Sequence, residues 1–127
     1  MTVHDSTVDA DTAVAHYFEA WNEVDPRRRE ELVRNTWARE ARSVDPLADV
    51  SGHDEISKMI GDVHVQFPGI TVTRTSAIDT HHDRLRFAWE IGQADGTVLM
   101  FGIDVVRLDA QGRFAELVGF FGELETS

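Results

Sequence analysis

The segment from Val98 to Val106 constrains the fold more than any other, because it is apolar on both sides of the strand it predicts. Alternate residues of a strand point to opposite sides, and the two sets here are Val98, Met100, Gly102, Asp104 and Val106, and Leu99, Phe101, Ile103 and Val105. Apolar surface of this kind needs cover on both sides. We therefore expect one side to line a pocket beneath helices, and a second copy of the chain, in a homodimer, to cover the other.

Asp104 is the one charged residue in this run. An ionised, unpaired carboxylate in such surroundings would cost several kcal/mol, so the residue must find a cationic partner or keep its proton through a raised pKa. Two interpretations follow. Asp104 is either a structural residue paired with a buried arginine, or a neutral acid that donates a hydrogen bond inside a catalytic pocket.

Helical patterns come first in the chain and strand patterns follow, which predicts a single α+β domain over residues 1–127, with residues 1–6 as a disordered tail. Helical spacing covers Thr7–Asn22, then a segment that begins at Asp25-Pro26 and runs through Trp37, then a segment after Gly52 that ends at Pro68-Gly69. Strands are predicted at Ala41–Asp45, and in a meander formed by Ile70–Asp79, Arg84–Gly92, Thr97–Leu108 and Phe114–Leu124.

Composition excludes several classes of function. The formal net charge of −11 disfavours nucleic acid and anionic membranes as partners. Without cysteine the chain has no disulfide and no thiolate nucleophile, and its one lysine, Lys58, falls on the polar side of a predicted helix. We find no long apolar stretch, signal-peptide pattern, metal-ligand spacing or phosphate-binding glycine pattern, and expect a cytoplasmic protein that uses neither metal nor cofactor.

Three short segments resemble one known superfamily. They are His16–Asn22, Val44-Asp45-Pro46, and Gly102-Ile103-Asp104 followed by the turn from Asp109 to Arg113. Together with the order of elements, they resemble the superfamily of nuclear transport factor 2, scytalone dehydratase, SnoaL-like polyketide cyclases and ketosteroid isomerases, and are most similar to the last. The resemblance implies a nuclear-transport-factor-2-like, cystatin-like fold. Its cone-shaped, curved, mixed or antiparallel sheet wraps around a pocket with three N-terminal helices.

The resemblance to ketosteroid isomerase also implies roles for three residues. Tyr17 and Asp104 would be the hydrogen-bond donors of an oxyanion hole, and Asp45 would be the general base. Proton abstraction next to a ketone gives a dienolate whose oxygen needs strong donors in a water-poor pocket, and a phenol with a neutral carboxylic acid supplies them. Ketosteroid isomerase is the known case of a carboxylic acid kept neutral for this purpose.

The expected ligand is a small, hydrophobic, carbonyl-bearing compound, steroid-like or polyketide-like. The expected pocket walls are large apolar side chains: Trp37, Met59, Val63, Phe67, Phe87, Trp89, Met100 and Phe120. His64 follows the apolar side of the third helix, and whether it reaches the pocket stays open.

Other interpretations remain open. Asp45 before a proline is also a common turn former, and Tyr17 on a buried helix side is also a common core residue. A SnoaL-like cyclase would use an acidic residue on a similar substrate, and a non-catalytic dimeric binding module could share the fold. An epoxide hydrolase with an Asp-Arg-Asp arrangement is disfavoured, because Gly102 stands where the arginine would be sought.

Overall fold

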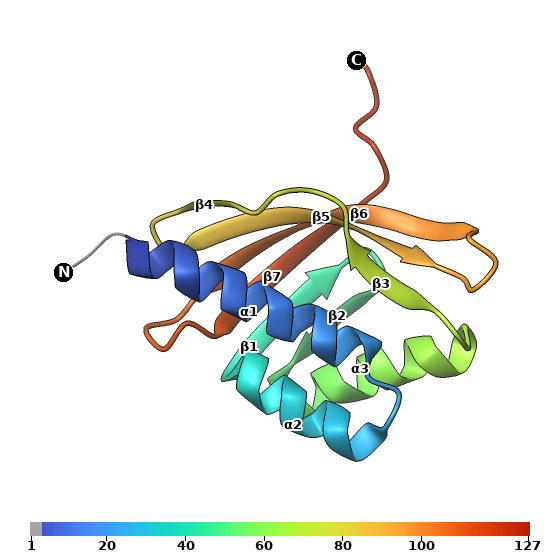
Figure 1. Ribbon diagram of the computed structural model, residues 1–127, viewed down its shortest axis with the longest axis horizontal. Coiled ribbons are helices and arrows are strands. Elements are labelled where there is room, and N and C mark those ends of the chain that lie inside the picture. Colours follow the sequence, from blue (N-terminus) through green and yellow to red (C-terminus); the bar gives the residue numbers. More distant parts are fainter. Residues whose placement is uncertain (1–3) are drawn as a thin grey trace.

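The structure is a computed structural model that describes residues 4–127, with side chains described from Ala10 onward. Three helices lie on one face of a curved sheet, and none of the described residues forms a helix on the opposite face (Figure 1). The elements in chain order are α1 His4–Asn22, α2 Pro26–Thr36, β1 Trp37–Asp45, β2 Ala48–Ser51, α3 Gly52–Gln66, β3 Thr71–Arg74, β4 Asp79–His81, β5 Arg84–Gly92, β6 Val98–Leu108 and β7 Phe114–Phe121. The predicted α+β class and the three N-terminal helices are confirmed.

The seven-stranded sheet has the order β2-β1-β7-β6-β5-β3, and β4 pairs with β5 off this path. All neighbours are antiparallel except β1 and β7, which run parallel, so the sheet is mixed. This pairing places the first strand of the chain beside the last one. The end of β1 at Asp45 thereby reaches the middle of β7, whose Gly119 pairs with Asp104 on β6.

Helix α2 begins as its sequence predicts and ends one residue earlier. Asp25 is the N-cap, its side chain accepts a hydrogen bond from the backbone N–H of Arg27, and Pro26 occupies the first turn. Trp37, expected inside this helix, is instead extended (φ −105°, ψ 144°) and opens β1. Burial of its indole against the ring of Phe114, with centroids 5.2 Å apart, outweighs the helical spacing that suggested a longer helix.

Other boundaries also differ from the predictions. Helix α1 begins at His4, three residues before the predicted start at Thr7, while residues 1–3 of the predicted tail lie outside the described residues. The predicted strand from Ile70 to Asp79 is two short strands, β3 and β4, because residues 75–78 leave the regular ladder. The predicted last strand ends at Phe121, and Gly122 follows in a left-handed conformation (φ 76°).

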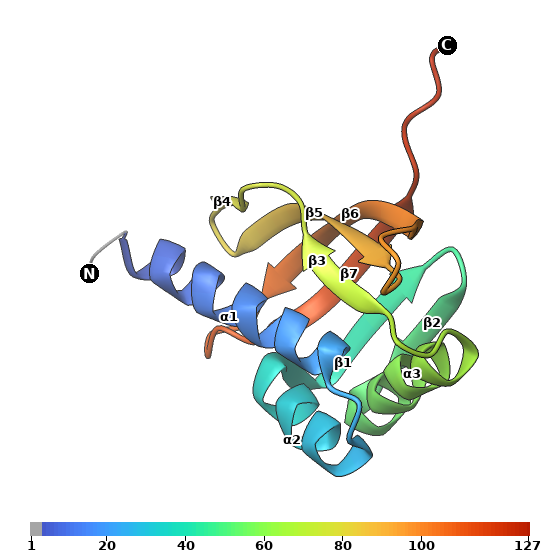
Figure 2. The same ribbon diagram turned by 45° about the vertical axis from the view of Figure 1, so that its right-hand side comes forward.

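Helix α1 crosses the strands on the inner face of the sheet (Figure 2). Most of the buried side chains lie between the helices and this face. On the outer face, large apolar side chains of β6 and β7 remain exposed: Phe101 by 45%, Ile103 by 46%, Val105 by 38% and Phe120 by 61%. The expectation that β6 is apolar on both sides is therefore met, with only the inner side covered within one chain. Among residues 4–127, no helix is both apolar and long enough to cross a bilayer.

Candidate functional site

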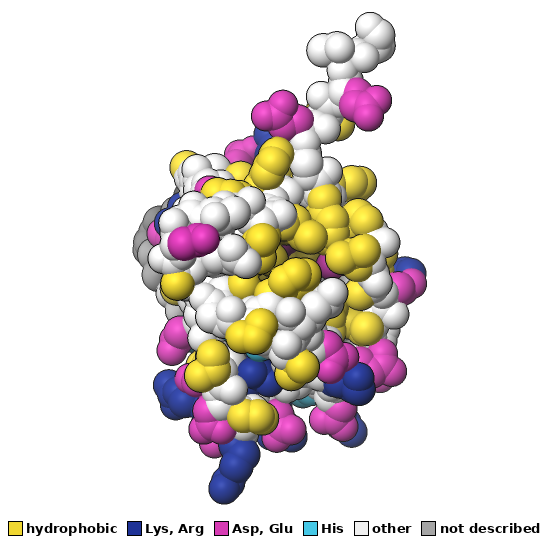
Figure 3. Space-filling view, turned by 90° about the vertical axis from the view of Figure 1, so that its right-hand side faces the viewer, with side chains coloured by type: hydrophobic (Ala, Val, Ile, Leu, Met, Phe, Trp, Pro, Cys, Tyr) yellow, Lys and Arg dark blue, Asp and Glu magenta, His cyan; other side chains and the backbone are white. Residues whose placement is uncertain are grey.

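A cavity of about 210 Å³ opens between the inner face of the sheet and α1 and α3. Figure 3 shows hydrophobic side chains gathered around a hollow on this side of the molecule, with acidic atoms visible inside it. Its polar lining residues are Tyr17, Ser43, Asp45, Gln66 and Asp104. The apolar ones are Trp21, Leu47, Ala48, Met59, Val63, Phe67, Val72, Trp89, Ile91, Leu99, Met100, Leu117 and Phe121.

Asp104 lies at the inner end of this cavity with 3% of its surface exposed, and its partner is Tyr17. The Tyr17 hydroxyl donates a hydrogen bond of 2.7 Å to Asp104 Oδ2, joining α1 to β6 across 87 residues of sequence. Among the side chains that the structure describes, no arginine contacts Asp104 by a hydrogen bond or an ion pair. The buried Arg29 donates instead to the backbone carbonyls of Glu23 and Val24, at the start of α2.

Burial favours the neutral form of both groups in this pair. It raises the pKa of Asp104 to about 7; the hydrogen bond from Tyr17 and the nearby indole N–H of Trp89 oppose the rise, and the negative charge of Asp45 adds to it. Burial, followed by the charge of Asp104, also raises the pKa of the Tyr17 hydroxyl well above its usual value. Near neutral pH, Tyr17 therefore keeps its proton and can donate, and Asp104 keeps its proton to a much higher pH than an ordinary aspartate.

Aromatic rings hold Tyr17 in place from behind. Its ring stacks on Phe114 at 5.2 Å, and Trp37 and Phe87 meet it edge-on at 5.9 and 5.5 Å. Trp37 and Phe87 were predicted as pocket walls, and this prediction is wrong, because neither lines the cavity. Both are almost fully buried behind Tyr17, where they fix its ring and its hydroxyl.

Asp45 both forms a turn and lines the cavity. Its Oδ1 accepts hydrogen bonds from the backbone N–H groups of Leu47 (2.8 Å) and Ala48 (2.9 Å), which form the tight connection between β1 and β2. No hydrogen bond to Asp45 Oδ2 is found among the described residues, so this oxygen stays available to a ligand. The turn fixes the carboxylate while leaving one oxygen free to act.

Gly119 separates the two carboxyl groups. A methyl group at position 119 would lie 2.9 Å from Asp104 Oδ1 and 3.3 Å from Asp45 Cβ. Its absence leaves open the space between the predicted base and the predicted acid. A small group bound there can contact both.

The remaining predicted wall residues divide into two sets. Met59, Val63, Phe67, Trp89 and Met100 line the cavity. Phe120 does not, and the prediction is wrong, because it points to the outer face with 61% of its surface exposed. His64 also stays outside, and its Nε2 lies 2.6 Å from the carbonyl oxygen of Trp21.

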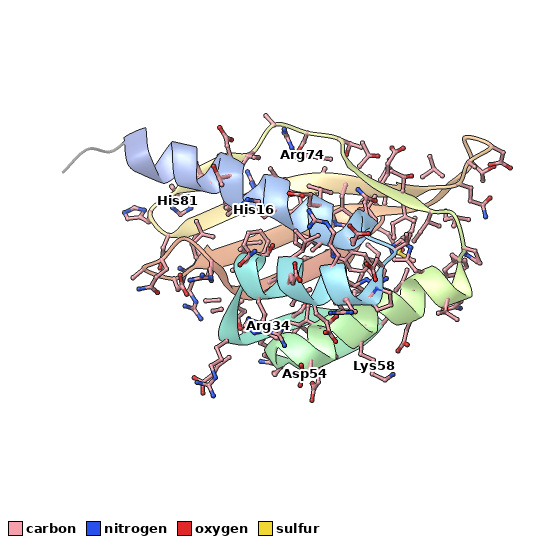
Figure 4. The ribbon with its side chains drawn as sticks, turned by 60° about the horizontal axis from the view of Figure 1, so that its bottom comes forward. His16, Arg34, Asp54, Lys58, Arg74 and His81 are labelled. Atoms are coloured by element: carbon pink, nitrogen blue, oxygen red, sulfur yellow. The ribbon has the colours of Figure 1, made fainter. Side chains whose placement is uncertain are left out.

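The single lysine, Lys58, does not line the cavity. Lys58 pairs with Asp62 at 2.9 Å, and Figure 4 shows Arg34, Asp54 and Lys58 projecting from α2 and α3 away from the sheet. Within the described part of the chain, no three His, Asp or Glu side chains come together as a metal-binding group.

Sequence reasoning missed two polar residues of the cavity, Ser43 and Gln66. Ser43 lies two residues before Asp45 on the same side of β1, so strand alternation from Asp45 would have found it. Gln66, in the last turn of α3, carries no comparable signal, because the side it faces depends on how the helix docks.

Comparisons with known proteins agree with this architecture. The family model described as a SnoaL-like domain matches residues 14–117. A solved structure from Agrobacterium tumefaciens, described as a candidate isomerase of the SnoaL-like family, is 36% identical, with a TM-score of 0.86 over 91% of this chain and 99% of its own. No curated protein matches the chain.

More distant structures share the fold. A candidate SnoaL-like polyketide cyclase from Jannaschia sp. CCS1 is 14% identical, with a TM-score of 0.73 over 90% of this chain and 85% of its own. A nuclear-transport-factor-2-like protein of unknown function from Exiguobacterium sp. 255-15 is 19% identical, with a TM-score of 0.70 over 88% of this chain and 99% of its own.

Proposed function

The chain belongs to the SnoaL-like family, and from this premise we propose that it is a cofactor-independent isomerase. It would move a proton next to the carbonyl group of a small hydrophobic ketone. One observation carries the proposal: the buried Tyr17–Asp104 hydrogen bond lies at the inner end of an apolar cavity, with the free oxygen of Asp45 across Gly119. Acid and base thus share one ligand site.

The reaction begins with the carbonyl oxygen of the ligand at Asp104. Asp45 Oδ2 removes a proton from the carbon between the carbonyl and a β,γ double bond. The electrons of that C–H bond form a new double bond, and the carbonyl π electrons move to oxygen, which gives a dienolate. Asp45 then returns the proton to the γ carbon, the oxygen regains its double bond, and the conjugated ketone leaves.

Tyr17 and Asp104 act on the oxygen as a unit. Tyr17 donates to Asp104 Oδ2, so a proton carried on Oδ1 points toward the space that Gly119 leaves open. A hydrogen bond to this oxygen strengthens as the negative charge develops, and the apolar walls keep competing water away. Tyr17 also lines the cavity, but its single hydroxyl proton serves one acceptor at a time, so it donates to the ligand oxygen only when it turns away from Asp104.

The size of the cavity limits the ligand. Its volume of about 210 Å³ lies below the range of roughly 300–1,000 Å³ common for drug-sized ligands. A ligand of one or two rings would fill it, and the far rings of a steroid would extend through the mouth.

The test is conversion of a β,γ-unsaturated ketone to its conjugated isomer, followed by ultraviolet absorbance. A cyclohexenone and a 3-ketosteroid are compared as substrates. Asp45→Asn removes the base and keeps a hydrogen-bond acceptor for the turn, so we expect turnover to fall at least about 100-fold with the melting temperature retained. Asp49→Asn, an exposed change on the neighbouring strand, is the control. Equal turnover by Asp45→Asn and wild type contradicts the proposal.

Two other functions are separated by the same assay. A polyketide cyclase, the description given to the Jannaschia structure, would leave both ketones unchanged but close a ring in a polyketide. A binding module would bind the conjugated ketones without converting any substrate. In that case Asp104 would only satisfy Tyr17 inside the fold.

We also propose a homodimer formed through the outer face of the sheet. Phe101, Ile103, Val105 and Phe120 together expose an apolar surface on β6 and β7. A second copy of the chain would bury this surface and leave the cavity mouth, on the other side of the sheet, accessible.

A further inference from the structure

One buried donor beside the acid has no partner. The indole Nε1 of Trp89 is buried and makes no hydrogen bond in the described structure, although Trp89 lines the cavity with only 6% of its surface exposed. A buried N–H left without a partner destabilises the folded state. A phenylalanine would fill much of the same space without that cost.

Gly102 determines where this indole lies. Trp89 pairs with Gly102 across β5 and β6, and a methyl group at position 102 would come within 2.7 Å of Trp89 Cζ2. Cζ2 and Nε1 are attached to the same ring carbon, so the edge of the indole that carries the N–H lies over Gly102. Asp104 is two residues further along the same side of β6.

A second contact fixes the angle of the ring. Phe121 meets the Trp89 indole edge-on, at 5.6 Å between centroids and an interplanar angle of 87°. Held between Gly102 and Phe121, the N–H lies close enough to Asp104 to lower the pKa of that carboxyl, although it falls outside hydrogen-bonding geometry.

We propose that Trp89 is a positioning residue, whose indole N–H completes the donor set around the Asp104 carboxyl by closing onto it when the group ionises. The inference rests on the proposed function in assigning the acid of the site to Asp104. Burial and the charge of Asp45 raise the pKa of Asp104, and the indole of Trp89 and the hydroxyl of Tyr17 lower it. Together they determine the pH at which Asp104 loses its proton. Activity that needs neutral Asp104 would end at that pH.

The other surroundings of Asp104 make this assignment specific. The titratable groups facing it in the described structure are Tyr17 from α1 and Asp45 from β1. From α3 the cavity receives Met59, Val63, Gln66 and the C-cap Phe67, and from β7 Leu117 and Phe121, none of which titrates.

The test is a carboxyl titration by carbon-13 NMR on protein labelled in aspartate, with the Asp104 signal assigned by its loss in Asp104→Asn. Trp89→Phe removes the N–H and keeps an aromatic ring. We expect the pKa of Asp104 to rise by about one pH unit and the alkaline limit of turnover to move up with it. A merely structural loss of packing would not extend activity to higher pH.

The control is Trp37→Phe. The Trp37 Nε1 is equally buried and equally without a partner, but the side chain lies behind Tyr17 and outside the cavity. Phenylalanine keeps an aromatic ring against Tyr17, so this variant should leave the pKa of Asp104 at its wild-type value. An unchanged pKa in Trp89→Phe, or an equal rise in both variants, overturns the inference.

Two provisions keep the test decisive. If Trp89→Phe does not fold, the indole N–H signal of Trp89 in the wild type, assigned through its contacts with Phe121, is followed against pH. It should move with the Asp104 midpoint, and an indole signal that ignores this midpoint overturns the inference. Neither measurement needs a substrate. If the protein shows no turnover but the pKa of Asp104 rises in Trp89→Phe, only the proposed isomerase activity is contradicted. If the protein is active but this pKa does not rise, only the inference about Trp89 is contradicted.

Discussion

Neighbouring residues of β6 meet opposite surroundings. Asp104 is 3% exposed on the inner side of the strand, while Ile103, next to it, is 46% exposed on the outer side. This is the reverse of the usual distribution, in which carboxylates face water and isoleucines face the core. The buried acid on the inner side destabilises the fold, and the outer side leaves apolar surface exposed. Both features are typical of binding surfaces and not of a strand that only supports the fold.

The largest effect that we expect comes from Asp104 on the inner side of β6. Its titration should make the free energy of unfolding depend on pH. The usual pKa of this carboxyl is 3.8, and it is about 7 in the folded protein. Between these values the folded protein keeps a proton that the unfolded chain has released, so the free energy of unfolding falls as the pH rises from about 4 to about 7 and levels off above. The loss is on the order of 4 kcal/mol.

Urea denaturation at several pH values measures this loss. Asp104→Asn has no titrating group and should lose less stability than the wild type over the same range, and the exposed change Asp83→Asn should behave like the wild type. Equal losses in wild type and Asp104→Asn would show that Asp104 titrates normally in the folded protein.

Substitutions on the inner side of β6 should lower activity much more than substitutions on the outer side. Asp104→Leu removes the donor to the ligand oxygen, so turnover should fall about 10²–10³-fold. Ile103→Leu, one residue away on the outer side, should leave turnover within about twofold. The measurement is kcat/KM for the unsaturated ketone. Similar losses in both variants would mean that β6 affects activity through the fold as a whole.

The space between acid and base can be narrowed by one methyl group. Gly119→Ala would place Cβ 2.9 Å from Asp104 Oδ1, and the displaced carboxyl should cost about tenfold in kcat/KM. Val118→Ala, on the adjacent outer position of β7, is the matched change. Unaltered kinetics in Gly119→Ala would mean that the ligand does not use the space between Asp45 and Asp104.

Substitutions on the outer side of β6 should change dimer formation and leave turnover almost unchanged. This is the smallest effect on turnover that we expect. Ile103→Lys places a charge in the centre of the exposed apolar surface. It should convert the proposed dimer to a monomer in analytical ultracentrifugation, with kcat per chain changed less than about twofold. A wild-type protein that sediments as a monomer contradicts the dimer.

Local patterns identified most of the fold. The alternation in β5 and β6 and the proline and N-cap of α2 depend on neighbouring residues, and these elements lie close to the predicted ones. The parallel pairing of β1 with β7 could not be predicted from local pattern, because it joins segments far apart in the chain. The end of α2 was predicted wrongly for a related reason, because the burial of Trp37 depends on tertiary contacts.

The site was predictable to the extent that chemistry is visible in sequence. A carboxylate in an apolar strand marked Asp104, and the resemblance added Tyr17 and Asp45. The large side chains were harder, because a buried aromatic residue can line a cavity, as Trp89 does, or stand behind one, as Phe87 does. Both lie on the same side of β5, and only the position of Tyr17 above the sheet separates their roles.

The most direct test of the central claim is the titration of Asp104 in the wild-type protein, followed by carbon-13 NMR without any ligand. We expect a midpoint at about pH 7, so that the buried acid still carries its proton in a large part of the molecules near neutral pH. A midpoint close to the ordinary value, about 4, would contradict it, because Asp104 would then be a carboxylate unable to donate a hydrogen bond to a ligand oxygen.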